Sequence, residues 1–281
     1  MITIDEKVIK CIYKSRSSDG YKGDYGHTLV VSGSLGYVGS AYFTAMGAVR
    51  TGSGLVSLGT NENILDIMST KLNEVMVFSL EDSEKLKFIL EKVDCIVFGP
   101  GIGTDRKIHD ILKDILLNIN LPIVIDADGL SILSKELNIL KNRTAPTVLT
   151  PHYGEFSRLT DTPVDILKKS RAEYANKFAK ENGIILLLKD HRTLITDSLE
   201  TYINTTGNSA MANGGMGDVL AGMIGSFISQ GYSPLEAAIL SSYIHGLAGD
   251  ILSREMFVVN PTDILNILPY IIKKYVCNKN S

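Results

Sequence analysis

The residues best suited to chemistry lie in a glycine-rich segment of the C-terminal third, Gly214-Gly215-Met216-Gly217-Asp218. A helix that begins here would leave its first backbone N–H groups free for an anion such as a phosphate. A phosphate would repel Asp218 unless the carboxylate has a task, and accepting a proton from an attacking hydroxyl is such a task. The alternative is that Asp218 only complements the helix dipole. We predict a phosphate site with Asp218 as its catalytic base.

Two further glycine-rich segments follow predicted strands, Gly33–Ala41 and Gly99–Gly103. Glycine lets a ligand approach the backbone closely. The first segment could equally be a plain turn with Ser40 as the cap of the next helix. The second has more glycine than a plain turn requires, which favours a loop that lines a ligand. It is not a dinucleotide fingerprint, because Arg106 breaks the required spacing.

His152 and Glu155 follow another predicted strand and are three residues apart. They would share one face of a helix that starts here, where they could bind a polar substrate edge or hold a metal-bound water. A plain helix start is the narrowly favoured interpretation, with Pro151 in the first turn and Glu155 complementing the dipole. A zinc site is not favoured, since no second His or Cys lies at ligand spacing.

Two charged groups also stand directly after apolar runs. Lys189 follows Ile184–Leu188 and could reach a phosphate as a point charge, although solvated lysines are commoner. Asp126 and Asp128 follow another run and could contact Mg²⁺ through water or only cap the next turn. We predict Glu155 and Asp126 as metal contacts through water. The Walker pattern is absent, which excludes a P-loop nucleotide site.

The elements that must position these residues alternate between strand and helix, which predicts parallel strands with helices on both faces. The predicted strands are Thr28–Ser32, Leu55–Leu58, Val75–Phe78, Cys95–Phe98, Ile123–Ile125, Thr147–Leu149 and Ile184–Leu188. The predicted helices are Ser40–Arg50, Asp105–Leu117, Val164–Lys180, Asp218–Gln230, Pro234–Leu252 and Thr262–Tyr270. Thr193–Thr196 and Glu200–Ile203 predict a hairpin at the sheet edge. We expect one domain over residues 1–281, with a frayed tail from Lys273.

The composition excludes several classes of protein. Lys plus Arg number 28 against 31 Asp plus Glu, so there is no basic excess to hold nucleic acid. The three cysteines, Cys11, Cys95 and Cys277, form neither a disulfide framework nor a CxxC pair, which suits a reducing cytosol. The N-terminus lacks the layout of a secretory signal, and no apolar stretch approaches the ~20 residues of a membrane span. We expect a cytoplasmic protein with no membrane partner.

Taken in order, the motifs resemble those of the ADP- or ATP-dependent NAD(P)H-hydrate dehydratases, whose domain is similar to ribokinase. The similarity runs from about Gly26 to Gly249. The segments that carry it are Gly33–Ala41, Ala48–Gly54, Gly99–Gly103, Asp126–Leu130, Thr150–Glu155, Lys189–Thr193, Gly207–Asn208 and Gly214–Asp218. The resemblance implies a ribokinase-like three-layer α/β sandwich with a mostly parallel central sheet.

The resemblance also implies a role for each matching residue. Asp218 would be the base on the substrate hydroxyl, and Gly215 and Gly217 would form the anion hole. The expected nucleotide contacts are Lys189, Asp190, His191, Arg192, Thr193, Asn208 and Gly217. The expected contacts to the hydrated nicotinamide nucleotide are Ser40, Ala41, Gly103, His152 and Asp218.

Members of this family move a phosphoryl group from the nucleotide to the hydroxyl of the S form of hydrated NADH or NADPH. The group then leaves as phosphate, which restores the reduced nucleotide. The resemblance therefore implies a hydro-lyase for metabolite repair, with ADP or ATP as donor and Mg²⁺ as cofactor. It also implies a homotetramer. A separate epimerase is expected for the R hydrate, because only about two dozen residues precede the matched segment.

Two positions depart from the family pattern. Asp190 stands where glycine is usual, and an extra carboxylate near the phosphates would weaken or reshape nucleotide binding. Asn73-Glu74 stands where Pro-Glu is common.

Two other functions stay open. One is a kinase of the same fold, acting on a hydroxyethylthiazole or a hydroxymethylpyrimidine. The other is a silent nucleotide-binding protein, which the presence of Asp218 disfavours.

Overall fold

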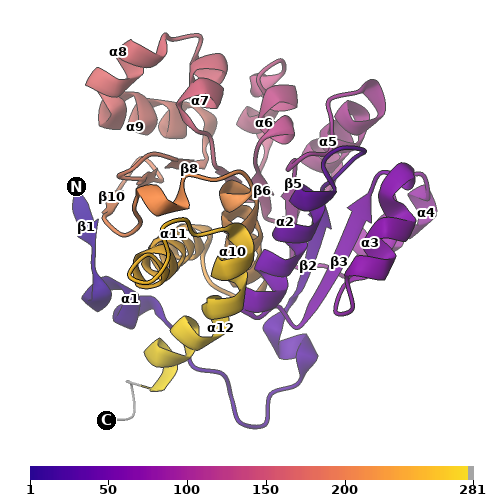
Figure 1. The fold of residues 1–281 in the computed structure, drawn as a ribbon. Coiled ribbons are helices and arrows are strands. Elements are labelled where there is room, and N and C mark those ends of the chain that lie inside the picture. Colours follow the sequence, from indigo (N-terminus) through magenta and orange to yellow (C-terminus); the bar gives the residue numbers. More distant parts are fainter. Residues whose placement is uncertain (278–281) are drawn as a thin grey trace.

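A ten-stranded sheet runs through the computed structural model, which describes residues 1–277 (Figure 1). The strand order is β1-β10-β9-β8-β7-β6-β5-β2-β3-β4, and only β9 is antiparallel to its neighbours. The strands are β1 Ile2–Ile4, β2 His27–Val31, β3 Leu55–Thr60, β4 Met76–Ser79, β5 Cys95–Phe98, β6 Ile123–Ile125, β7 Thr147–Leu149, β8 Ile185–Leu188, β9 Leu194–Thr196 and β10 Thr201–Asn204. The predicted mostly parallel sheet is confirmed.

Helices cover both faces of this sheet (Figure 1). They are α1 Glu6–Ile12, α2 Val38–Thr51, α3 Leu65–Lys71, α4 Ser83–Leu90, α5 Arg106–Asn118, α6 Asp128–Leu133, α7 Tyr153–Thr160, α8 Val164–Lys169, α9 Arg171–Asn182, α10 Met216–Ser229, α11 Pro234–Leu252 and α12 Pro261–Cys277. Four short 3₁₀ turns are η1 Lys22–Tyr25, η2 Glu62–Ile64, η3 Leu137–Asn142 and η4 Ser209–Met211. Among the described residues, every helix is too short or too polar to cross a lipid bilayer.

The sheet separates two apolar cores. Successive strand residues point to opposite faces, so Val30 joins one core while Leu29 and Val31 join the other. Helices α2, α10, α11 and α12 close the first core, and α4, α5 and α9 close the second. This arrangement is the expected three-layer sandwich.

Small residues seat α10 close to the sheet and to α2. A Cβ on Gly222 would lie 2.1 Å from the carbonyl oxygen of Thr44, and one on Gly225 would lie 2.2 Å from a methyl group of Val97. Both positions therefore require glycine. The close approach fixes where the N-terminus of α10 meets the carboxyl ends of the strands.

Three predicted elements differ from the structure. The β9–β10 hairpin forms but is not the edge, because β1 pairs in parallel with β10. The predicted helix over 164–180 is broken at Ser170, where φ is −131°, and serine is a weak helix former that favours helix boundaries. The tail from Lys273 does not fray at once, since α12 continues to Cys277 with Tyr275 buried in the core. Residues 278–281 lie outside the described residues.

Candidate active site

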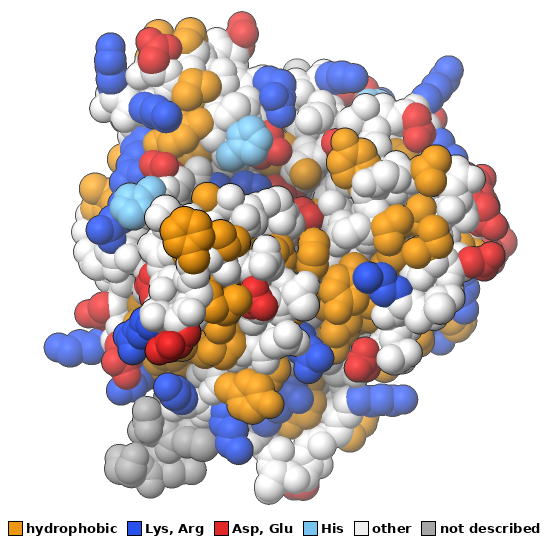
Figure 2. Space-filling model, viewed as in Figure 1, with side chains coloured by type: hydrophobic (Ala, Val, Ile, Leu, Met, Phe, Trp, Pro, Cys, Tyr) orange, Lys and Arg blue, Asp and Glu red, His pale blue; other side chains and the backbone are white. Residues whose placement is uncertain are grey.

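The predicted motifs lie at the carboxyl ends of five neighbouring strands, β8-β7-β6-β5-β2. Parallel strands end at the same edge of a sheet, so their following loops meet there. In spatial order these loops begin with Lys189, Thr150, Asp126, Gly99 and Ser32. Figure 2 shows a recess in this face, with histidine, acidic and basic side chains along it.

The predicted anion site is the N-terminus of α10. Gly215 is the N-cap residue with a φ of +91°, and no side chain caps the helix. The first N–H groups of α10 are therefore available to a ligand. A Cβ on Gly217 would lie 3.3 Å from Lys189 Nζ and 3.6 Å from Asp126 Oδ2. The helix terminus and an ammonium group thus face the same small space.

Lys189 is held by carboxylates from two other strand ends. Its Nζ lies 2.7 Å from Asp126 Oδ1 and 4.0 Å from Glu155 Oε2. Burial acts to lower the pKa of Lys189, but the carboxylates of Asp126, Glu155 and Asp218 outweigh it and raise the pKa above its ordinary value. The side chain stays an ammonium, which could act as a point charge for a phosphate.

Asp218 combines burial with a polar partner. Burial and the charge of Asp126 raise its pKa to about 6, against the lowering effects of a hydrogen bond from Ser40 and the charge of Lys189. A carboxyl group that titrates near neutral pH can accept a proton in one step and release it in another. Asp218 therefore has the protonation behaviour of a general base, next to the anion site.

A strained turn at the end of β6 positions the carboxylates of Asp126 and Asp128. Ala127 has a φ of +49° and a ψ of −115°, a conformation that L-residues rarely adopt and that clusters at functional sites. On one side of it Asp126 is buried, and on the other Asp128 Oδ2 accepts a 2.9 Å hydrogen bond from the Gly103 backbone. Sequence reasoning missed this link. It ties the Gly99–Gly103 loop to β6.

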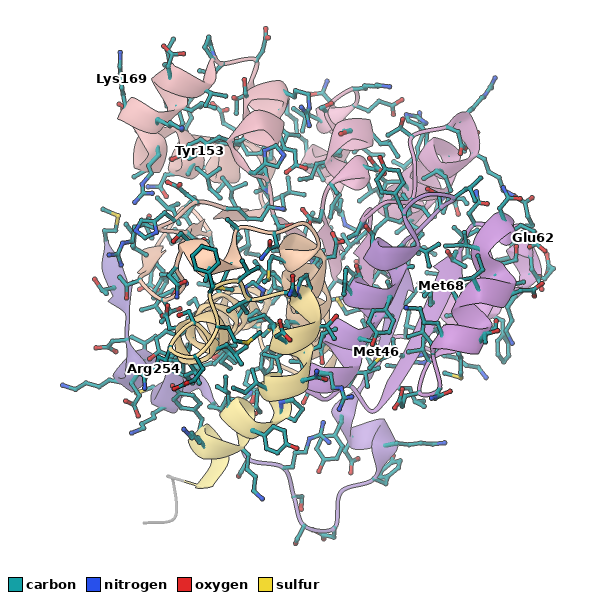
Figure 3. All side chains as sticks on the ribbon, in the orientation of Figure 1. Met46, Glu62, Met68, Tyr153, Lys169 and Arg254 are labelled. Carbon is teal, nitrogen blue, oxygen red and sulfur yellow. The ribbon has the colours of Figure 1, made fainter. Side chains whose placement is uncertain are left out.

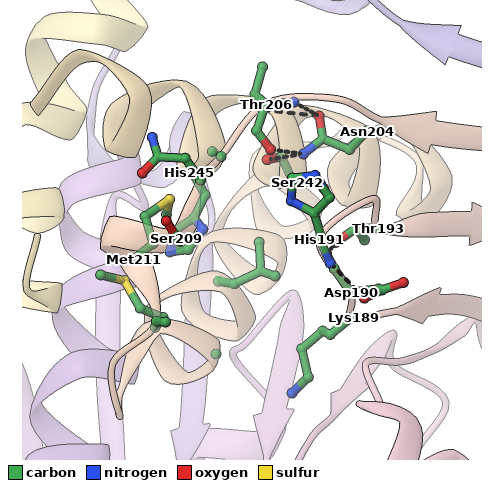
Figure 4. Close-up of a pocket in the computed structure, with 17 residues that line it drawn as sticks. Lys189, Asp190, His191, Thr193, Asn204, Thr206, Ser209, Met211, Ser242 and His245 are labelled. Carbon is green, nitrogen blue, oxygen red and sulfur yellow. Dashed lines mark hydrogen bonds between the residues drawn. The ribbon is translucent and has the colours of Figure 1, made fainter. Parts of the chain in front are cut away.

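A cavity of about 790 Å³ opens beside the start of α10 (Figure 4). Six of the seven predicted nucleotide residues line it, namely Lys189, Asp190, His191, Thr193, Asn208 and Gly217. Arg192 is not among the lining residues, because its guanidinium group turns to the carbonyl oxygen of Thr205. The predicted nucleotide loop and anion site are therefore brought to one cavity.

The far wall of the cavity comes from residues that sequence reasoning missed. They belong to the end of β10, to η4 and to α11 and include Asn204, Thr206, Met211, Ser242, His245 and Gly246. Burial lowers the pKa of His245 to about 4, so its ring is neutral at pH 7. The sequence signal for this wall was the polar group Ser241, Ser242 and His245 within the largely apolar α11.

Asn208 lines the cavity, and its side chain is held by neighbouring groups. Its side-chain amide donates to Asp250 Oδ1 at 2.7 Å and to Ser253 Oγ at 2.9 Å, while its oxygen caps η4. Asp250 Oδ2 also accepts a hydrogen bond from the Gly207 N–H at 2.9 Å. Because these groups are already paired, Asp250 fixes the 207–208 segment to α11.

The predicted substrate residues lie outside this cavity but beside Asp218 and the neighbouring strand ends. Ser40 donates to Asp218 and is partly exposed, whereas Ala41 is fully buried against Gly33. Gly103 adopts a φ of +92° and is partly exposed. Ser40, rather than Ala41, has a side chain available to a ligand.

His152 and Glu155 form the predicted helix start. The Nδ1 atom of His152 accepts hydrogen bonds from the Gly154 and Glu155 N–H groups, and Glu155 Oε2 accepts one from the His152 N–H. This reciprocal capping box confirms that the pair forms a helix start, but Pro151 precedes the N-cap residue His152 and is not in the first turn as predicted. The other edge of the exposed His152 ring is available to a ligand, with Nε2 3.5 Å from Glu155 Oε1.

The described part of the chain contains no group of three or more His, Cys, Asp or Glu side chains placed to hold a metal by themselves. Mg²⁺ commonly takes only one or two protein carboxylates and completes its shell with phosphates and water. Asp126 and Glu155, which already share Lys189, fit that limited role.

Known proteins match this chain over most of its length. A family profile described as NAD(P)H-hydrate dehydratase matches residues 28–270. The ADP-dependent (S)-NAD(P)H-hydrate dehydratase of Lactococcus lactis is 34% identical over 99% of this chain and 100% of its own. A bifunctional NAD(P)H-hydrate repair enzyme of Moorella thermoacetica is 37% identical over 92% of this chain. The match spans about half (51%) of that relative's length.

Two solved structures share the fold. A ribokinase-like superfamily protein from Enterococcus faecalis has a TM-score of 0.90 at 31% identity, with 98% of this chain and 96% of that chain covered. An ADP/ATP-dependent NAD(P)H-hydrate dehydratase from Bacillus subtilis, co-crystallised with ATP and Mg²⁺, has a TM-score of 0.86 at 29% identity, with 98% of each chain covered. The predicted ribokinase-like fold is confirmed, and the chain belongs to the NAD(P)H-hydrate dehydratase family.

Proposed function

We propose that this chain is an ADP-dependent (S)-NAD(P)H-hydrate dehydratase, with ADP or ATP as the phosphoryl donor. The observation that carries the proposal is the pairing of Asp218, whose pKa is raised to about 6, with the uncapped N-terminus of α10. A base and an anion site side by side are what the transfer of a phosphoryl group to a hydroxyl requires.

In the first step Asp218 accepts the proton of the substrate hydroxyl while the hydroxyl oxygen attacks the terminal phosphorus of the nucleotide. The bond between that phosphorus and the bridging oxygen breaks, and AMP leaves when ADP is the donor. In the second step the C–O bond breaks and phosphate departs. Loss of a proton from the adjacent ring carbon restores the double bond of NADH or NADPH. The N–H groups at Gly215 and Gly217 stabilise the phosphoryl charge.

The other residues bind and orient. We assign Lys189 and the loop to Thr193 to the nucleotide phosphates and sugar, because this loop lines the cavity. Ser40, Gly103 and His152 are assigned to the hydrated nucleotide, because they lie at the strand ends around Asp218. When bound, Mg²⁺ would neutralise phosphate charge, with Asp126 and Glu155 as its contacts through water.

The test is to incubate the protein with Mg²⁺, ADP and the S hydrate of NADH while following the absorbance of reduced nicotinamide. We expect NADH, AMP and phosphate to form in equal amounts. A kinase of the same fold would instead consume nucleotide with a thiazole or pyrimidine alcohol and release a stable phosphate ester. No NADH with either ADP or ATP would contradict the proposal.

Four further features belong to the same proposal. We infer that residues 1–281 form one domain, which a single continuous sheet supports. Family resemblance favours a homotetramer, an epimerase supplied by another polypeptide, and a cytoplasmic location. Size-exclusion chromatography with light scattering measures the assembly, and a mixture of the R and S hydrates tests the need for a separate epimerase. Without added epimerase we expect only the S fraction of the mixture to react.

A further inference from the structure

Asp190 places a negative charge in the wall of the cavity assigned to a nucleotide. It is the second residue of the Lys189–Thr193 loop, and its side chain is 36% exposed. A phosphate group carries the same sign of charge, so an unbalanced Asp190 would repel the ligand. The repulsion would act through partly solvated space and would depend on salt.

Arg171 balances this charge. Its Nη1 atom lies 3.1 Å from Asp190 Oδ2, and the same atom donates to the carbonyl oxygen of Arg192 at 2.9 Å. The hydroxyl of Tyr153 also lies 3.4 Å from Asp190 Oδ2. Figure 3 shows Tyr153 between the α8–α9 region and the loops at the strand ends. One guanidinium group therefore joins two points of the nucleotide loop to α9.

The position of Arg171 in its helix needs an explanation of its own. It is the first residue of α9, directly after the break at Ser170. A positive charge at a helix N-terminus is disfavoured by the helix dipole. The contacts to Asp190 and Arg192 offset that effect, because they pair the charge outside the helix. The side chain is three-quarters buried, with 25% of it exposed, which limits screening by solvent.

We propose that Arg171 is a positioning residue for the nucleotide, because it neutralises Asp190 and holds the Lys189–Thr193 loop against α9. The inference rests on the proposed function, since it takes this cavity as the nucleotide site. It also accounts for the carboxylate at position 190, where the family pattern has glycine. The paired carboxylate acts as an anchor for the loop and not as a free charge facing the phosphates.

The experiment measures the dissociation constant of Mg·ADP by calorimetry at two salt concentrations. Arg171→Ala should weaken binding about three- to fivefold at low salt, the scale of one exposed to half-buried ion pair. The loss should shrink at about 0.5 M salt. In an Asp190→Asn background the same Arg171→Ala change should cost less affinity than in the wild type, because only the contact to the carbonyl oxygen of Arg192 is then lost.

Two further variants separate charge from geometry. Arg171→Lys keeps the charge but cannot make the two guanidinium contacts together, so it should recover only part of the lost affinity. Lys177→Ala removes one positive charge from the same helix, where Lys177 lies 4.0 Å from Glu181 and outside the cavity. It should leave the affinity for Mg·ADP unchanged.

Steady-state kinetics gives a second readout. Arg171→Ala should raise KM for ADP while kcat and KM for the hydrate change less than twofold. Equal loss of affinity in the wild-type and Asp190→Asn backgrounds would overturn the inference, as would wild-type affinity in Arg171→Ala. If the wild-type protein itself binds no Mg·ADP, the proposed function fails together with the inference. Binding without dehydration would contradict the proposed function alone.

Discussion

The carboxylate of Asp126 lies 2.7 Å from the ammonium group of Lys189, although the two residues are 63 positions apart in the chain. Asp126 follows β6 and is almost fully buried, whereas Lys189 follows β8. Strand β7 lies between them, so the pair bridges three neighbouring strand ends. The Asp126 carboxylate therefore holds the positive charge of Lys189 in place in the candidate site without any ligand.

Lys189→Met should destabilise the fold by about 3 kcal/mol, because it leaves the buried carboxylate of Asp126 without its partner. The double variant with Asp126→Asn should regain much of that loss, since no buried charge remains. Urea denaturation of the two single variants and the double variant measures the coupling. Additive losses would show that the two side chains contribute independently.

Asp218→Asn should lower kcat by roughly 10²–10⁴-fold, the scale of one lost general base. The affinity for Mg·ADP should stay close to that of the wild type, because the amide keeps the shape of the carboxylate. Single-turnover kinetics and calorimetry give the two quantities. Asp114→Asn, on the exposed side of α5, is the matched control. Normal turnover in Asp218→Asn would remove this residue from the mechanism.

The raised pKa of Asp218 predicts opposite pH trends for activity and stability. The base must be ionised, so kcat/KM should rise with pH through about 6 and be about tenfold below its plateau at pH 5. The folded carboxyl group holds its proton more tightly than the unfolded one. The group therefore stabilises the fold at pH values below its unfolded pKa, and this stabilisation is lost as the pH rises through about 6.

A pH–rate profile and thermal melts over the same range check both trends. In Asp218→Asn the stability contribution that depends on this group should disappear, whereas the contributions of other groups remain. A wild-type activity profile that is flat between pH 5 and 7 would contradict the assigned pKa.

Gly217→Ala should weaken nucleotide binding by at least about tenfold, the scale of a single blocked contact, without harming the fold. The added methyl group would lie 3.3 Å from Lys189 Nζ, in the space assigned to a phosphate. Alanine is also the better helix former by about 1 kcal/mol, so the melting temperature should hold or rise. Thermal melts with and without Mg·ADP measure both effects. An undiminished ligand-induced shift would argue against a phosphate at this turn.

Asp250→Ala should raise KM for the nucleotide about tenfold while kcat changes little. The substitution leaves the Gly207 N–H without its acceptor and removes one of the two acceptors of the Asn208 amide, so the cavity wall loses an anchor on α11. Asp250→Asn keeps one acceptor oxygen and should recover part of the affinity. A loss confined to kcat would place Asp250 in a different role.

Much of the site was predictable because its motifs are local. The glycines before Asp218, the loop from Lys189 and the loop from Gly99 each follow a strand, and strand ends can be predicted from short apolar runs. The parallel topology then places these ends on one edge. Several elements were not predicted, namely β1 and the short helices α1, α3, α4 and α6. The break at Ser170 was missed because it interrupts an apolar pattern that is compatible with one long helix.

The sequence by itself determined the fold class and the glycine-rich turns and led to the prediction that Asp218 is the base, since each depends on residues close together in the chain. Only the tertiary structure decided which charges meet. The pairing of Lys189 with Asp126, the balance of Asp190 by Arg171 and the wall of the cavity from α11 join segments that are distant in sequence. The pKa of Asp218 likewise depends on burial and on charges from other strands, and these arise only when the chain has folded.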